Sequence, residues 1–217
     1  MNSTKEKLAV ESQTTLLLPA QVYADICDVV SRAKDGCETG VWLFGVAVRQ
    51  FRVVLTIVGP GPRATLEPAH YSADNDYASE VYNALRSALP SIEWLGELHV
   101  HPRGMPWLSR GDRRTVQEIL EGAAADTVRP HEFIAGVMQR RAGKVDIYPY
   151  HFVSATEGRT MPMERVPTEA EIVQAARLVA VENRHVVPPN EPASQKETPR
   201  CQGWLRRVVS LVRRGNT

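Results

Sequence analysis

Two histidines separated by one residue stand at the end of an apolar run, and a proline follows them directly. Because side chains alternate between the two faces of a β-strand, His99 and His101 lie on the same face if this run is a strand. Pro102 lacks the amide donor that the next ladder hydrogen bond needs, so we expect the strand to end there. Both imidazoles can therefore reach one metal ion at a strand terminus.

Ser109 and Asp112 follow the histidine pair, and Asp112 falls in the first turn of a helix predicted over residues 110–124. Two imidazole nitrogens and one carboxylate leave a fourth tetrahedral position for water, which distinguishes catalytic from structural zinc. The alternative is a capping box, in which the Ser109 hydroxyl and the Asp112 carboxylate bind amide groups at the helix start. The sequence predicts one zinc ion per chain, held by His99, His101 and Asp112.

The spacing of these residues resembles the signature of the JAMM (MPN-plus) metallopeptidases, which reads His-x-His-Pro-x6-Ser-x2-Asp. Segment 38–45, which begins with Glu38, is similar to the upstream glutamate element of that family. Glu97 before the first histidine and Thr115 after the aspartate are most similar to a bacterial branch encoded beside relatives of ubiquitin-activating and ubiquitin-conjugating enzymes. The resemblance covers residues 12–153.

The resemblance implies an α/β fold with a mixed sheet flanked by helices, the JAMM/MPN (cytidine-deaminase-like) fold. It implies a zinc-dependent peptidase or isopeptidase that cuts after the C-terminus of ubiquitin or a ubiquitin-like protein, either to process precursors or to reverse conjugation. The implied setting is a bacterial ubiquitin-like conjugation pathway, often one of antiphage defence, and the implied partners are the ubiquitin-like protein, its conjugates, and the activating and conjugating enzymes.

Two other function classes stay open at this point. One is a non-catalytic MPN scaffold that keeps the fold and loses the ligands, which the intact ligand set argues against. The other is a DNA-linked protein of the RadC type, which shares a similar His-x-His-Pro signature. The formal net charge of +1 gives no electrostatic support for nucleic-acid binding.

The family pattern also assigns roles. Glu38 is the candidate general base, which takes a proton from water and passes it to the departing amine. Ser109 would direct its hydroxyl toward the oxyanion of the tetrahedral intermediate. Glu97 is a rival base because it shares a strand face with His99, although the family pattern favours a hydrogen-bonding or substrate-binding role for it. Trp107, in the intervening loop, is either a contact for a substrate tail or an apolar plug.

The remaining histidines have no metal-like spacing, and we expect turn or surface positions for His70, His131, His151 and His185. The three cysteines, Cys27, Cys37 and Cys201, form no Cys-x-x-Cys pair, which favours reduced thiols in the cytoplasm. No apolar run approaches the roughly 18 residues of a membrane span, and the first residues are polar. We therefore predict a cytoplasmic protein without a signal peptide.

Periodicity places the elements along the chain. Strands are predicted at residues 14–19, 40–49 and 52–58, then in the histidine run, and as a hairpin at 132–140 and 144–153. Helices are predicted at residues 21–34, 74–89, 110–124 and 168–183. The catalytic domain is predicted to span residues 1–155, followed by a C-terminal helix within 156–185 that packs on the domain or on a partner.

The end of the chain has a different composition. Residues 186–202 are rich in proline and polar residues, and predict a flexible linker. Residues 203–217 have apolar residues on one helical face and arginines on the other, which suits an anionic membrane surface or an acidic partner groove. A tail helix that docks on its own domain fits the same pattern.

Overall fold

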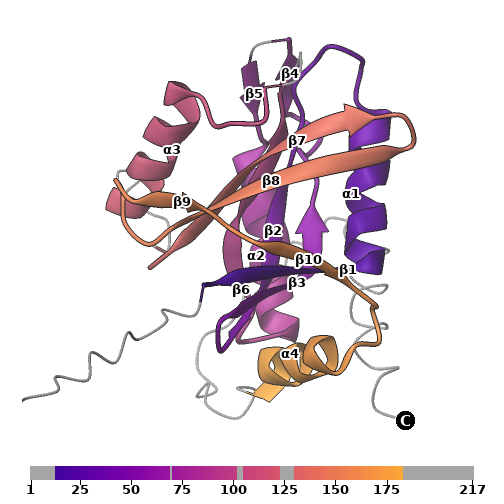
Figure 1. The fold of residues 1–217 in the computed structure, drawn as a ribbon, viewed down its shortest axis with the longest axis vertical. Helices are drawn as coiled ribbons and strands as arrows, with labels where there is room; N and C mark the ends of the chain where they lie inside the picture. The colour runs from indigo at the N-terminus through magenta and orange to yellow at the C-terminus, as the bar shows by residue number, and fades with distance from the viewer. Residues whose placement is uncertain (1–12, 69, 102–104, 123–129, 183–217) are drawn as a thin grey trace, which may run out of the picture.

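The structure is a computed structural model that describes residues 13–68, 70–101, 105–122 and 130–182 (Figure 1). These residues form an eight-stranded mixed sheet, a separate two-stranded hairpin and four helices. The strands of the sheet are β1 (Thr15–Pro19), β2 (Gly40–Val48), β3 (Phe51–Val58), β6 (Glu93–Val100), β7 (Phe133–Arg141), β8 (Lys144–Phe152), β9 (Gly158–Thr160) and β10 (Met163–Val166). The hairpin consists of β4 (Thr65–Glu67) and β5 (His70–Ser72), and the helices are α1 (Ala20–Arg32), α2 (Asn75–Ala88), α3 (Arg110–Glu121) and α4 (Glu171–Glu182).

The order of strands across the sheet is β10, β1, β3, β2, β6, β7, β8, β9. β1 is parallel to both of its neighbours, and β6 is parallel to β7, whereas the other neighbouring pairs are antiparallel. The β7–β8 pair crosses the view of Figure 1 at a steep angle to β1 and β10, so the sheet curls along its width. The predicted α/β class, with a mixed sheet flanked by helices, is confirmed.

Helices cover both faces of this sheet because its central strands are apolar on both sides. In β2, Val41 and Leu43 belong to the core cluster beneath α1, whereas Phe44 belongs to the cluster that α2 and α4 complete. Helix α3 packs on β7. Strands buried on both faces read as nearly continuous apolar runs, which is how β2 and β3 appear in the sequence.

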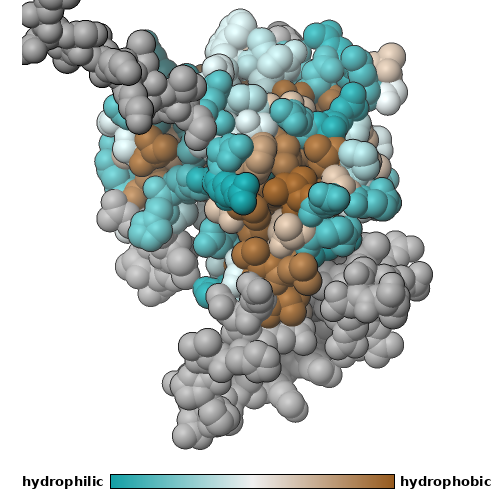
Figure 2. Space-filling model, turned by 60° about the horizontal axis from the view of Figure 1, so that its bottom comes forward, coloured by the Kyte–Doolittle hydropathy of each residue, from teal (hydrophilic) through white to brown (hydrophobic). Residues whose placement is uncertain are grey.

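Helix α4 packs on β2 and β3 through Val173, Ala176 and Ala180. Of the two predicted alternatives, packing on the domain or on a partner, the structure shows packing on the domain. Two of its apolar residues, Leu178 and Val179, stay exposed. Figure 2 shows an apolar band on the face of the molecule where α4 lies.

Three parts of the structure were not predicted. The β4–β5 hairpin lies between β3 and α2, and strands β9 and β10 lie between β8 and α4. Since β9 pairs with β8 and β10 pairs with β1, the sheet continues past residue 155. The predicted linker, residues 186–202, and the basic segment, residues 203–217, lie outside the described residues. None of the helices in the described ranges is both long enough and apolar enough to cross a membrane.

Candidate metal centre

The two histidines of the motif lie at the C-terminal end of β6, as predicted. His99 is the second-last residue of β6, and His101 is the first residue after the strand. Both side chains are buried. Their Nε2 atoms lie 2.8 Å apart, which brings both imidazoles to one point on the same face of the sheet. The period-two argument from the sequence is therefore confirmed for this pair.

Asp112 reaches the same point from the first turn of α3. Its Oδ1 lies 3.3 Å from the Nε2 of His99, and its Oδ2 lies 3.2 Å from the Nε2 of His101. The ligand atoms of these three residues all fall within 4.8 Å of one another. Within the described part of the chain, this is a group of side chains that could hold a metal ion.

Ser109 fixes the start of α3, and with it the position of Asp112. The Ser109 hydroxyl accepts a hydrogen bond from the amide of Asp112 at 3.2 Å, and the Asp112 Oδ2 accepts one from the amide of Ser109 at 2.5 Å. The capping box that the sequence offered as an alternative is thus present together with the cluster of ligands. The Asp112 carboxylate belongs to both the capping box and the cluster of candidate metal ligands.

The distances are close to those between the ligands of a tetrahedral metal ion. Metal–ligand bonds of about 2.0–2.2 Å at the tetrahedral angle separate neighbouring ligand atoms by roughly 3.3–3.6 Å. Each histidine lies near this distance from one oxygen of Asp112, His99 at 3.3 Å from Oδ1 and His101 at 3.2 Å from Oδ2. The two Nε2 atoms, at 2.8 Å, would move apart by about half an ångström. The Nδ1 atom of His101 is buried without a hydrogen-bond partner among the described residues. No hydrogen bond from these residues to Nδ1 therefore determines which ring nitrogen of His101 carries the proton.

The electrostatics of the cluster favour a carboxylate facing imidazoles. Burial alone would raise the pKa of Asp112, but hydrogen bonds from His101 and His99 outweigh it and hold that pKa well below its usual value. Burial alone would lower the pKa of His99, whereas the bond to Asp112 raises it above its usual value. The ionised carboxylate that a cation requires is therefore present at neutral pH.

An open cavity of about 1320 Å³ adjoins the cluster, and His99, Asp112, Glu38 and Glu97 all line it. Burial raises the pKa of Glu38, while the nearby His99 and His101 oppose this rise. Burial also raises the pKa of Glu97, and His99 again opposes the rise. Both glutamates proposed as bases from the sequence thus lie within electrostatic range of the metal ligands.

Two contacts fix the segment that carries Glu38. The Glu38 amide donates to the carbonyl of Glu67 in the β4–β5 hairpin at 2.9 Å. Earlier in the segment, Arg140 of β7 donates to the Asp35 carboxylate at 2.7 Å and to the Lys34 carbonyl at 3.3 Å. The segment is therefore held by two elements that are distant in the sequence, and the hairpin binds Glu38 directly.

A β-bulge in β6 determines which side chains face this cavity. Leu43 pairs with Gly96 and Phe44 pairs with Trp94, so Leu95 is an extra residue in the ladder. Because of this insertion, Trp94 lies on the same face as Glu97 and His99, although simple alternation would place Leu95 there. Gly96 has a φ of +152°, and a Cβ at this position would lie 1.9 Å from the Ile134 carbonyl oxygen. Only glycine fits.

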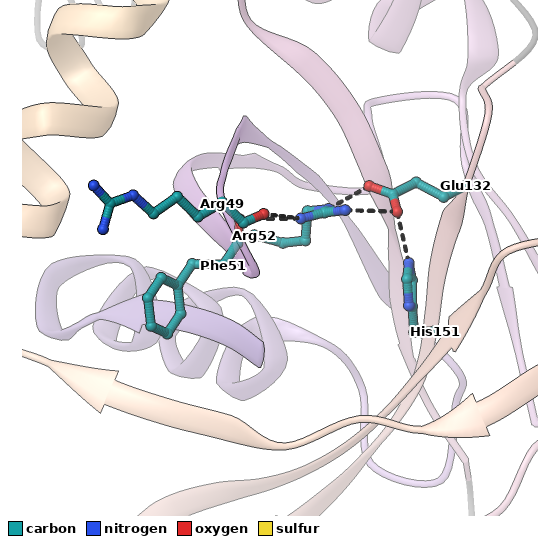
Figure 3. A network of polar contacts seen from close by, with 5 residues as sticks. All are labelled: Arg49, Phe51, Arg52, Glu132 and His151. Atoms are coloured by element: carbon teal, nitrogen blue, oxygen red, sulfur yellow. Dashed lines mark hydrogen bonds and ion pairs between the residues drawn. The ribbon is translucent and has the colours of Figure 1, made fainter. Parts of the chain in front are cut away.

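The other histidines lie outside the metal cluster. His70 is exposed on β5, His131 is exposed before β7, and His185 lies outside the described residues. His151 belongs to a separate polar cluster, in which its Nε2 lies 2.8 Å from the Glu132 carboxylate that Arg52 also binds (Figure 3). Among the described residues, none of these histidines belongs to the group of side chains that could hold a metal ion.

The side chain of Trp107 is 55% exposed, so it does not act as a buried apolar plug.

Sequence reasoning missed Trp42 and Tyr71, which also line the cavity. Trp42 points from β2 beside Glu97, and Tyr71 reaches the cavity from the unpredicted β5 strand. An alternation analysis extended to β2 could have found Trp42, but no local pattern indicated Tyr71.

No protein-family model and no curated protein matches this chain. Among solved structures, the chain is similar to the solution structure of protein DSY2949 from Desulfitobacterium hafniense, a structural-genomics target. The TM-score is 0.54 and the sequence identity is 16%, over 73% of this chain and 96% of that one. At this identity the similarity shows a shared α/β fold, and the possible metal site rests on the geometry of His99, His101 and Asp112.

Proposed function

We propose that this protein is a zinc-dependent peptidase or isopeptidase of the JAMM type. The observation that supports the proposal is the convergence of His99, His101 and Asp112 at the edge of a cavity that Glu38 also lines. The residues whose spacing resembles the JAMM signature lie at a strand end and a helix start, and the Glu67 carbonyl accepts from the amide of Glu38. Two histidines and one carboxylate, with room for a further ligand, suit catalytic zinc.

Zinc in this site would polarise a substrate carbonyl and bring the pKa of a water molecule to about 7. The residues of the chain do the rest. Glu38, whose pKa burial raises, accepts a proton from water and delivers it to the departing amine. The Ser109 oxygen accepts from the Asp112 amide, which leaves its hydroxyl hydrogen free to donate toward a developing oxyanion.

The proposed substrate is ubiquitin or a ubiquitin-like protein, cleaved after its C-terminus during precursor processing or deconjugation. This follows from the resemblance of the motif to the bacterial branch of the family, and so does a role in a ubiquitin-like conjugation pathway of antiphage defence. The proposed partners are the conjugated proteins and the activating and conjugating enzymes of that pathway.

The test is metal analysis of the purified protein together with cleavage of ubiquitin-like fusions encoded in the same genomic neighbourhood. We expect one zinc ion per chain, loss of cleavage on chelation and recovery on addition of zinc. Glu38→Ala should keep the zinc and lower turnover by about 10²-fold to 10⁴-fold, the usual contribution of a general acid–base.

Glu118→Ala is the matched control, because Glu118 lines the same cavity from α3 and pairs only with the exposed Arg114 in the described ranges. It should keep both zinc and turnover. A parent protein that binds no zinc, or a Glu38→Ala variant with the parent's turnover, would contradict the proposal.

A further inference from the structure

We propose that Trp42, Tyr71 and Glu97 form a subsite in the cavity that binds an amide group of the substrate. The inference rests on the proposed function, since it concerns the substrate of the same centre. The subsite would recognise an amide beside the metal ligands. Its side chains are used neither by the metal cluster nor by the proposed acid–base step.

The pairing of β2 with β6 places these side chains next to the metal centre. Gly40 pairs with His99, and the next pair on the same face is Trp42 with Glu97. Two residues along a strand span about 6.6 Å, so the Trp42–Glu97 pair lies roughly two residues of an extended peptide from the metal ligand. All of these side chains except Gly40 line the cavity.

Tyr71 completes the subsite from the β4–β5 hairpin. Its ring lies directly over Gly40, because a Cβ at residue 40 would be 2.6 Å from the Tyr71 Cε1 atom. A glycine at this position is therefore required for the ring to lie there. Tyr71 and Glu97 line the same cavity. Burial raises the pKa of the Tyr71 hydroxyl there, and the nearby Glu97 raises it further.

Two polar atoms of this subsite are buried without partners. Neither the indole Nε1 of Trp42 nor the hydroxyl of Tyr71 has a hydrogen-bond partner among the described residues. In contrast, the indole Nε1 of the neighbouring Trp94 donates to the Gly96 carbonyl at 2.9 Å. A buried polar group left without a partner is unfavourable, and most such groups are paired in folded proteins. Two such groups in one cavity wall indicate a partner from outside the chain.

The chemistry of the three groups selects the ligand. The indole N–H of Trp42 only donates, so it requires an acceptor such as a carbonyl oxygen. The Glu97 carboxyl offers acceptor oxygens for an N–H donor, and the Tyr71 hydroxyl can either donate or accept. An amide offers both a carbonyl and an N–H, whereas a guanidinium or ammonium group offers only donors and would leave Trp42 unpaired. Because both unpaired polar atoms are enclosed by the wall, the side chains of Trp42 and Tyr71 must both rotate when the ligand binds.

The test is an NMR titration of the full-length protein, which follows the indole Nε1–H resonance of Trp42. The probes are a capped dialanine peptide, propanamide and ethylguanidinium, which represent a main-chain amide, a side-chain carboxamide and a cation. We expect the capped peptide to shift the Trp42 resonance saturably while the Trp94 resonance changes little. Tyr71→Phe should weaken binding by about threefold to tenfold, the loss of one hydrogen bond.

Tyr82→Phe is the matched control, because Tyr82 also lines the cavity but stacks on Phe44, farther from the metal ligands. It should leave the titration unchanged. Equal binding of propanamide would support an amide subsite filled by a side chain, and preference for the capped peptide would support a main-chain source. A shift with ethylguanidinium alone, or no saturable shift with any probe, would overturn the inference.

The titration reads binding without turnover, so it separates this inference from the proposed function. A protein that binds the capped peptide at Trp42 but never cleaves a ubiquitin-like fusion would refute the proposed function alone. A protein that cleaves the fusion, with KM and kcat unchanged in both Trp42→Phe and Tyr71→Phe, would refute the subsite alone.

Discussion

At the scale of single residues, Asp112 combines two roles that the sequence presented as alternatives. Its Oδ2 accepts from the amide of Ser109, and its two oxygens also face His101 and His99. The capping box fixes the first turn of α3, and the fixed turn aims the carboxylate at the histidines. The same side chain is therefore a helix cap and a candidate metal ligand.

Substitutions at the two ends of the capping box should separate these roles. Asp112→Ala removes a cap and a ligand, so we expect loss of zinc binding. Ser109→Ala removes a cap and the proposed oxyanion donor but no metal ligand, so we expect it to keep zinc while it lowers the free energy of unfolding by about 1 kcal/mol. Zinc content by metal analysis, and urea unfolding with a chelator present, measure the two effects. Loss of zinc from Ser109→Ala to the same extent would show that the cap is required for the ligand geometry.

At the scale of the elements, the bulge in β6 shows why a motif can be predicted while the cavity around it is not. His99 and His101 lie close to the end of the strand, beyond the bulge, so simple alternation places them correctly. Leu95 is the extra residue itself, and Trp94 lies before it, on the face that simple alternation would give to Leu95. A period-two analysis of the sequence cannot detect such an insertion.

Gly96 makes this bulge possible, and its replacement should be costly. We expect Gly96→Ala to lower the free energy of unfolding by at least about 3 kcal/mol, because the new Cβ would overlap the backbone of β7. Gly143→Ala is the control, since Gly143 also has a positive φ, of +72°, but open space around it. It should cost only roughly 1–2 kcal/mol. Equal costs in urea unfolding would contradict the steric explanation.

The elements that the sequence failed to predict share a physical property. The strands β4, β5 and β9 have three residues each and β10 has four, with little buried apolar surface, so they show no clear hydrophobic period. Some of their hydrogen bonds join partners far along the chain, as when β10 pairs with β1 or the Glu67 carbonyl accepts from the amide of Glu38. The long apolar strands and the amphipathic helices were predicted because the pattern of apolar residues within each element shows which of its faces is buried. Tyr71 was missed for the same reason as its strand.

At the scale of the whole molecule, the curled sheet brings together strands that are not neighbours in it. β2 and β6 lie between β3 and β7 in the strand order, yet Arg52 of β3 forms an ion pair with Glu132 at the start of β7. His151 of β8 joins the same carboxylate, as Figure 3 shows. Because an ionised carboxylate only accepts hydrogen bonds, both partners donate to Glu132. The cluster connects the two halves of the sheet at the end away from the metal ligands.

This cluster should make stability depend on acid pH. Burial alone would raise the pKa of Glu132, but hydrogen bonds from His151 and Arg52 lower it to about 2, below its usual 4.5. A lowered carboxyl pKa means that the stabilisation is complete above pH 4.5 and is lost as the pH falls through 2. We expect Glu132→Gln to lower the free energy of unfolding by about 2 kcal/mol at pH 7, and the difference from the parent to shrink below pH 4.5. Glu118→Gln, in an exposed pair, should show no such difference in urea unfolding, and a Glu132→Gln deficit that stays constant down to pH 3 would contradict the assignment.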